Sequence, residues 1–189
     1  FSLAGGLAET EHVFLAGNDL PARFHPGFHI AELGFGTGLN LLAALHLWRR
    51  TRQSGVLHFT SFEAFPMRPH EMTGAQREFL ALPDIAEELV PHWHAEAEKV
   101  TLADLAFRLI RGDARETVAA WDRLADAWFL DGFSPAKNPE LWGAELMWQV
   151  ASHTVSNGTA ATYTAGGFVL RGLEAAGFSV ERRSGYGRK

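Results

Sequence analysis

Short apolar segments alternate with amphipathic segments along this chain, and that alternation constrains its fold more than any other feature. The apolar segments have the length and composition of buried strands, whereas the others have helical spacing. The predicted strands are 29–33, 56–62, 106–110, 127–130, 159–164 and 178–183. The predicted helices are 39–50, 69–82, 114–121, 140–155 and 168–176. Strands that alternate with helices indicate an α/β fold with a mainly parallel sheet and helices on both faces.

Acidic side chains stand at or near the carboxyl ends of the first four predicted strands. They are Glu32, Glu63, Asp113 and Asp131. In open parallel sheets ligands bind at this edge, near the point where the strand order reverses. We therefore expect the four carboxylates to surround one pocket.

Length and composition narrow the class of protein. The chain has 189 residues, which suits one domain, and no repeat or linker divides it, so we expect a single domain over 1–189. Because Phe1 is not a methionine, we expect upstream residues in a longer protein. The absence of cysteine excludes disulfides, thiolate metal sites and a cysteine nucleophile, and favours a cytoplasmic location. No run approaches the ~18 apolar residues of a membrane span, so a soluble protein is expected.

The charge balance bears on possible partners. The net charge of −5 argues against a general nucleic-acid coat protein, whose affinity comes from neutralising many phosphates, but leaves a structured RNA substrate open. Basic residues gather in 182–189, which is either a solvated tail or a phosphate contact. His92 and His94 stand two apart without further ligands at a suitable spacing, so we predict no metal.

A glycine-rich loop joins the first predicted strand to the first predicted helix. Residues 32–40 read Glu-Leu-Gly-Phe-Gly-Thr-Gly-Leu-Asn, and the glycines allow a sharp turn and close approach to a ligand. The dinucleotide fingerprint requires a small residue at the position of Leu39, so NAD is disfavoured. The loop instead resembles the first motif of class I methyltransferases that use S-adenosylmethionine, which have a Rossmann-like fold.

That resemblance implies a set of cofactor-binding residues. They are Glu32, Gly34, Phe35, Gly36, Thr37, Gly38, Asn40, Glu63, Asp113, Ala114 and Asp131. Glu63 takes the place of the acid that accepts both ribose hydroxyls, in charge-assisted hydrogen bonds. Asp113 would accept from the adenine amino group, with the Ala114 N–H beside it. The alternative for Asp113 is a helix N-cap, a position that Asp favours.

Residues 126–142 form the most specific stretch of the sequence. They read Asp-Ala-Trp-Phe-Leu-Asp-Gly-Phe-Ser-Pro-Ala-Lys-Asn-Pro-Glu-Leu-Trp, and they closely resemble the methyltransferase domain of the MnmC family. The similarity extends to 1–18, 34–40, 61–66 and 185–189, which is nearly the full length. It is poorest over 84–104, where we assign no function. Ser134 replaces an alanine expected in relatives, a small change that should preserve activity.

The resemblance implies methyl transfer from S-adenosylmethionine to the amine of 5-aminomethyluridine, often with a 2-thio group, at the wobble position of tRNA. Asp131 is the expected catalytic residue. The implied substrate-binding residues are Phe133, Pro135, Lys137, Asn138, Gly167 and Phe168. Many relatives carry a second, FAD-dependent oxidoreductase domain that generates this amine, and we expect no such domain within these 189 residues.

The chemistry requires a neutral amine held in line with the methyl group. Holding the two reacting groups in this geometry can lower the activation free energy by about 7–11 kcal/mol. We expect Asp131 to orient the amine rather than to act as a strong base, because a carboxylate of pKa near 4 is poorly matched to an ammonium group.

Two other functions fit the same fold. One is N-methylation of a small-molecule amine, which the acidic net charge would suit. The other is a non-catalytic module that binds the cofactor and docks a partner oxidoreductase. Asp131 and its loop discriminate between catalysis and mere binding, because a module needs no polar acceptor site beside the methyl group.

Overall fold

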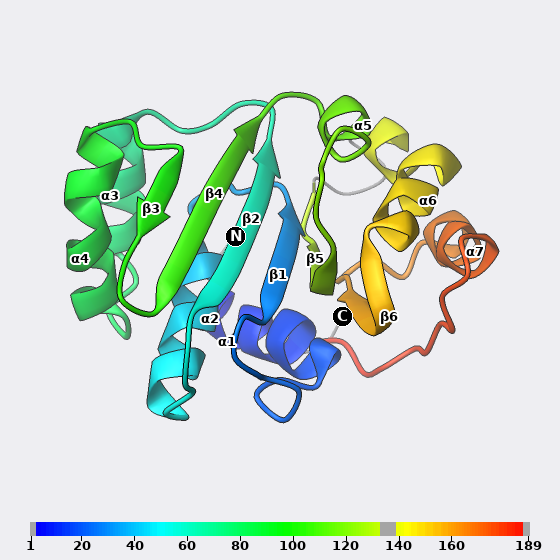
Figure 1. Cartoon of the computed structure of the whole chain (residues 1–189), viewed down its shortest axis with the longest axis horizontal. Coiled ribbons are helices and arrows are strands. Elements are labelled where there is room, and N and C mark those ends of the chain that lie inside the picture. The colour runs from blue at the N-terminus through cyan, green and yellow to red at the C-terminus, as the bar shows by residue number, and fades with distance from the viewer. Residues whose placement is uncertain (1–2, 133–138, 187–189) are drawn as a thin grey trace.

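The computed structural model describes residues 3–132 and 139–186, and its centre is a six-stranded sheet (Figure 1). The strand order is β3-β4-β2-β1-β5-β6, with β3 antiparallel to β4 and the other five strands parallel. The strands are β1 His29–Leu33, β2 Leu57–Glu63, β3 Lys99–Thr101, β4 Leu105–Arg111, β5 Ala125–Leu130 and β6 Thr154–Ala161. The strand order therefore reverses at β1, where the predicted ligand edge should lie.

Helices cover both faces of the sheet. One face packs against α1 Leu3–Thr10, the short turns Glu11–Leu15 and Ala16–Asn18, α2 Leu39–Arg50, α3 Pro69–Arg77 and α4 Pro83–His94. The other face packs against α5 Ala114–Thr117, α6 Ala144–Ser152 and α7 Gly167–Ala175. Pro139–Trp142 forms a 3₁₀ turn before α6.

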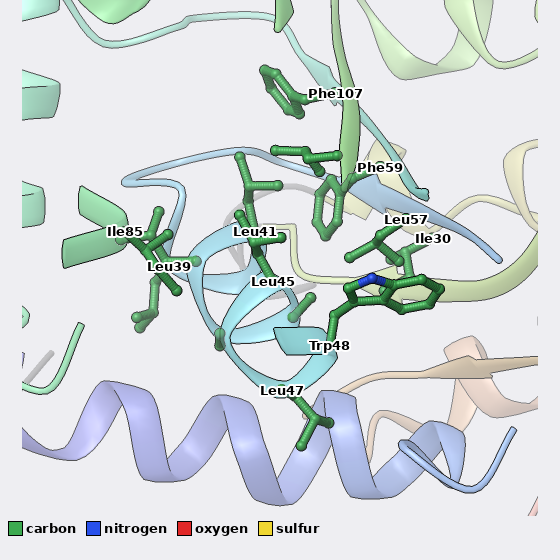
Figure 2. Close-up of a cluster of buried hydrophobic side chains, with 14 of the residues drawn as sticks. Ile30, Leu39, Leu41, Leu45, Leu47, Trp48, Leu57, Phe59, Ile85 and Phe107 are labelled. Atoms are coloured by element: carbon green, nitrogen blue, oxygen red, sulfur yellow. The ribbon is translucent and has the colours of Figure 1, made fainter. Parts of the chain in front are cut away.

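The sheet separates two buried clusters, because successive side chains of each strand point to opposite faces. Ile30 and Phe59 point to the first face, where Leu41, Leu45 and Trp48 of α2 pack on them (Figure 2). Other side chains of β1, β2 and β5 point to the opposite face: Ala31, Leu33, Phe62, Trp128 and Leu130. Helices on both faces explain why nearly every side chain of β1 and β5 is buried.

Several predicted elements are confirmed, and others are corrected. The strand over 29–33 and the helix over 39–50 have the predicted bounds. The predicted helix over 69–82 is wrong in length, because α3 ends at Arg77 and Pro83 starts a new helix, a position that proline favours. The helix expected through 121 ends at Thr117. Within the predicted helix 140–155, the last two residues belong to β6.

Two further corrections concern the sheet edges. The antiparallel strand β3 lies within the segment that carried no prediction, and its three residues are too short to show a pattern. The predicted strand over 178–183 is wrong, because this segment forms no strand in the part of the chain that the structure describes. Its alternation has another cause: Phe178 and Val180 pack against the second buried cluster.

Candidate functional site

The strand ends that carry the predicted acids line up in register. Leu33 of β1 is paired with Phe62 of β2 and with Leu130 of β5, so the residues that follow these three positions lie at one level. Those residues are Gly34, Glu63 and Asp131. Asp113 follows β4, whose Arg111 is paired with Glu63. The carboxyl edge thus presents Asp113, Glu63, the glycine loop and Asp131 in that order.

The glycine loop is packed on one side and open on the other. Gly34 has φ +86°, and a Cβ there would lie 2.9 Å from the carbonyl oxygen of Asp131. Gly36 has φ +52°, and a Cβ at this position would meet nothing within 4 Å. Glycine adopts the left-handed backbone at both positions without steric cost. The loop is therefore supported by Asp131, the residue that follows β5, and its other side is free for a ligand.

Glu63 holds the glycine loop to the loop that follows β2. Its Oε2 accepts hydrogen bonds from the Phe35 N–H at 2.9 Å and from the Gly36 N–H at 3.2 Å. Its Oε1 accepts from the Phe65 N–H at 2.8 Å. Each carboxylate oxygen can accept more than one hydrogen bond, so Glu63, which is half-buried, retains capacity for a ligand.

A buried hydrogen-bond network lies beneath the loop, with Asn40 at its centre. The Asn40 Nδ2 donates to Glu32 Oε1 and to Asp131 Oδ2, both at 2.8 Å. The Thr10 hydroxyl donates to Asn40 Oδ1 at 2.9 Å, and the Ser61 hydroxyl donates to Glu32 Oε2 at 2.6 Å. Glu32 has no exposed surface. Its carboxyl group therefore supports Asn40 from below, and its expected contact with a cofactor stays a prediction.

Asp131 has the most informative electrostatic setting of the group. Burial raises its pKa to about 7, the Asn40 hydrogen bond acts in the opposite direction, and the charge of Glu9 raises it further. The expectation of an ordinary pKa near 4 is therefore wrong. A carboxyl group that titrates near neutrality can exchange a proton with a substrate at physiological pH.

Tyr163 joins this group although the sequence had not singled it out. Its hydroxyl donates to the Gly132 carbonyl, next to Asp131. Burial raises the pKa of Tyr163, and the charges of Asp131 and Glu9 add to this effect. Tyr163 lies just past the end of β6, so the strand-end rule that selected the four acids, applied to aromatic residues, would have found it. Thr10 carried no comparable signal, because its partner is 30 residues away.

Asp113 acts as the N-cap of α5, the alternative that the sequence had left open. Its Oδ1 accepts from the Arg115 N–H at 2.9 Å, and its carboxylate also pairs with the Arg115 guanidinium. The side-chain hydrogen bond from Arg115 lowers the pKa of Asp113. Ala114 is buried at the start of α5. The pair lies one strand beyond Glu63, because Gly112 N–H donates to the Glu63 carbonyl at 3.1 Å.

The acceptor side of the site is described in part. The expected substrate residues Phe133, Pro135, Lys137 and Asn138 lie outside the described residues. Gly167 starts α7, and the Phe168 side chain that follows it is 45% exposed. A cavity of about 170 Å³ lies on the other side of the glycine loop, lined by Phe35, Met72, Trp93 and Leu109 among others.

The residues that the structure describes contain neither a metal-binding cluster nor a membrane-spanning helix. No group of three or more His, Asp or Glu side chains is arranged there to hold a metal ion. Within the same residues, each helix is too short or too polar to cross a bilayer. The basic tail is partly engaged: Arg183 forms ion pairs with Asp19 and Glu181, which competes with the expected phosphate contact.

Comparisons with known proteins agree with this geometry. A family model described as an S-adenosyl-L-methionine-dependent methyltransferase matches residues 81–189, more than half of the chain. The tRNA 5-methylaminomethyl-2-thiouridine biosynthesis bifunctional protein MnmC of Caulobacter sp. strain K31 is 48% identical, over 100% of this chain and 34% of that protein. The MnmC protein of Caulobacter vibrioides is 45% identical, over 100% of this chain and 33% of that protein. The chain thus spans about a third of the length of these curated relatives.

Solved structures confirm the Rossmann-like class I fold. MnmC2 from Aquifex aeolicus superposes with a TM-score of 0.76 at 28% identity, covering 93% of this chain and 56% of that one. Precorrin-6y C5,15-methyltransferase from Geobacter metallireducens gives a TM-score of 0.50 at 15% identity, over 95% of this chain and 71% of that one, and so shares the fold alone. The resemblance that the sequence motifs indicated is confirmed.

Proposed function

The chain belongs to the S-adenosyl-L-methionine-dependent methyltransferase family, and we propose that it methylates the amine of 5-aminomethyluridine, with or without a 2-thio group, at the wobble position of tRNA. The product is 5-methylaminomethyluridine. The observation that carries this proposal is the packing of the Asp131 strand end against the Gly34 turn. This contact sets a carboxyl group that titrates near neutrality beside the loop that binds the methyl donor in this family.

The residues of the carboxyl edge fit the cofactor. The open side of Gly36 leaves room for a ligand. Glu63 already accepts three hydrogen bonds, so about one of the four acceptor sites of its carboxylate is left for a ribose hydroxyl. The loop residues Gly34–Gly38 would line the amino-acid and ribose parts, and Asp113 with Ala114 the adenine. S-adenosylmethionine, when bound, supplies a methyl group on a positively charged sulfur, which is open to attack by an amine.

Asp131 then prepares the nucleophile. A primary ammonium with a lysine-like pKa near 10.4 must lose a proton before its lone pair can react. A carboxylate with a pKa of about 7 accepts that proton at a cost about 4 kcal/mol lower than a carboxylate of pKa near 4. Asp131 thus combines the expected orienting role with that of a general base. If Asp131 also holds the amine in line with the methyl group, this positioning would lower the activation free energy by about 7–11 kcal/mol.

The acceptor base needs a flat apolar surface, because proteins recognise unpaired RNA bases by stacking. Phe168 exposes almost half of its side chain, and Tyr163 exposes 41% while its hydroxyl is held at Gly132. Phe133 and Pro135 would complete the wall, and Lys137 and Asn138 would contact the uracil or a phosphate. These last four assignments come from the motif similarity alone.

The relatives are named as bifunctional proteins, which suggests that this chain works together with a second enzyme activity. Since this chain spans about a third of their length, a second activity would reside in another part of the protein or in another chain. We propose that this partner is an FAD-dependent oxidoreductase that generates the amine. A small-molecule amine remains the alternative substrate, and the net charge of −5 favours it more than it favours RNA.

The experiment that tests the function compares three acceptors with labelled S-adenosylmethionine. They are tRNA bearing 5-aminomethyl-2-thiouridine, the free nucleoside and unmodified tRNA. Labelling of the aminomethyl tRNA alone supports the proposal. Preference for the free nucleoside would favour the small-molecule enzyme, and binding of the cofactor without labelling of any acceptor would favour the non-catalytic module.

A further inference from the structure

Thr10, the last residue of α1, takes part in the network that reaches Asp131. Its side chain is buried with 5% exposure, and its hydroxyl donates to Asn40 Oδ1 at 2.9 Å. Asn40 lies in the first turn of α2 and in turn contacts Asp131 at the end of β5. Three segments far apart in the sequence are therefore joined through two buried polar side chains.

The hydrogen bonds of Asn40 account for every polar atom of its amide. An asparagine side chain has two N–H donors and one carbonyl acceptor. The Nδ2 atom serves Glu32 and Asp131, and Oδ1 receives the Thr10 hydroxyl. Without that hydroxyl, the Oδ1 atom would be buried without a donor, and the amide would lose what holds its N–H groups toward the two carboxyl groups.

The two carboxyl groups below and beside Asn40 share its N–H donors. Burial raises the pKa of Glu32 well above its ordinary value, and the charge of Asp131 raises it further. Two nearby carboxyl groups that share a donor titrate as a pair. When Asp131 is ionised, the Asn40 N–H stabilises its charge.

We propose that Thr10 is a positioning residue: through Asn40 it orients and stabilises the ionised carboxyl group of Asp131, so that the end of α1 forms part of the active site. This inference rests on the proposed function for its catalytic meaning. Its structural content, the dependence of Asp131 on Thr10, is independent of the substrate.

The segment around Thr10 is anchored by other contacts, so a substitution of this residue should not detach it. Phe14 and Leu15 are buried in the first cluster. Asn18, which is fully buried, donates to the Trp128 carbonyl at 3.3 Å and accepts from the Thr159 hydroxyl. These contacts tie the segment to β5 and β6 without Thr10.

The test replaces the Thr10 hydroxyl and follows Asp131 directly. Thr10→Val removes the donor, Thr10→Ala repeats the removal without the second methyl group, and Thr10→Ser restores the donor. Thr73→Val is the matched control, because Thr73 is equally buried at 5% but lies on α3. The carboxyl ¹³C signal of Asp131, assigned by its loss in Asp131→Asn, is titrated in each protein.

The proposal predicts that the pKa of Asp131 rises by about one unit in Thr10→Val and Thr10→Ala, since a hydrogen bond to its charged form is weakened. Thr10→Ser and Thr73→Val should match the unsubstituted chain. In the methylation assay, the acid limb of kcat should move to higher pH by the same amount, with an unchanged KM for the cofactor. An unchanged Asp131 titration in both Thr10→Val and Thr10→Ala overturns the inference. Failure of the unsubstituted chain to methylate tRNA would overturn the proposed function, while the titration would still decide the role of Thr10.

Discussion

Gly34 and Asp131 touch through their backbones: a Cβ added to Gly34 would lie 2.9 Å from the Asp131 carbonyl oxygen. The loop that follows β1 and the strand end that follows β5 thus fix each other's position. Glycine is needed at position 34 for two reasons: a Cβ would clash with the Asp131 carbonyl oxygen, and the backbone has a φ of +86°. In the proposed function, Gly34 therefore couples the binding of the methyl donor to the placement of the Asp131 carboxyl group.

Replacing Gly34 tests that coupling. Gly34→Ala should lower the free energy of unfolding by about 1–2 kcal/mol, because the left-handed backbone is strained for alanine. It should also weaken the binding of S-adenosylmethionine about tenfold or more, since the loop must move away from Asp131. Urea unfolding and calorimetric titration measure the two effects.

Gly74→Ala serves as the control for Gly34→Ala. Gly74 lies within α3, and a Cβ there meets nothing within 4 Å. Alanine should stabilise this helix by about 0.5–1 kcal/mol and leave cofactor affinity unchanged. Equal cofactor affinity in both variants would show that the Gly34 contact does not shape the site.

Glu63→Gln should weaken cofactor binding about 10- to 100-fold, because hydrogen bonds to a charged group contribute more than those to a neutral one. The loss includes the weaker hold on the Phe35 and Gly36 N–H groups. Glu87→Gln, which alters an exposed ion pair with Arg77, should bind normally. A calorimetric dissociation constant that Glu63→Gln leaves unaltered would contradict its ribose role.

Asp131→Asn should retain cofactor binding and lose about 100-fold in kcat, since the amide cannot accept the proton. In the unsubstituted chain, kcat should rise with pH through an ionisation near 7, because Asp131 is active when ionised. That ionisation should vanish in the variant. Asp122→Asn, at an exposed position, is the control. A pH profile that is the same with and without Asp131 would exclude it as the base.

His29 should make the fold sensitive to mild acid. Burial lowers its pKa to about 4 from 6.5, and the charge of His58 lowers it further. Between these pH values the unfolded chain binds more protons, so the free energy of unfolding should fall as the pH drops from 6.5 to 4, by about 3 kcal/mol in total. Urea unfolding at several pH values measures this loss.

His29→Gln should flatten that pH dependence. His70→Gln, at an exposed position, should leave it unchanged. If the free energy of unfolding falls just as steeply with pH in His29→Gln, groups other than His29 cause the acid sensitivity.

The centre of the sheet could be predicted from the sequence because its local and tertiary signals agree. The apolar run of β1 and the helical spacing of α2 are both consistent with burial, and their bounds were confirmed. The helix over 69–82 was predicted too long, because Phe79 and Leu82 keep helical spacing and are buried although they lie in the turn after Arg77. The strand over 178–183 was wrong, because alternation also arises where Phe178 packs against a buried cluster without a neighbouring strand.

The candidate site was predictable where it depends on strand ends and not where it depends on tertiary contacts. The rule that parallel strands end at one edge brought Glu63 and Asp131 to the glycine loop. The same rule placed Glu32 there, but its full burial and its bond to Asn40 arise from packing that the sequence does not display. The pKa of Asp131 likewise depends on burial, so it required the folded structure.

The central claim is that the carboxyl edge of this sheet transfers a methyl group to an amine carried by tRNA. Mass spectrometry of the wobble nucleoside tests it most directly, after incubation of aminomethyl tRNA with S-adenosylmethionine and either the unsubstituted chain or Asp131→Asn. With the unsubstituted chain, we expect a mass gain of one methyl group in place of a hydrogen on the side-chain amine, and much less of this product with Asp131→Asn. A wobble nucleoside of unchanged mass, or a methyl group on the ring or ribose, would contradict it.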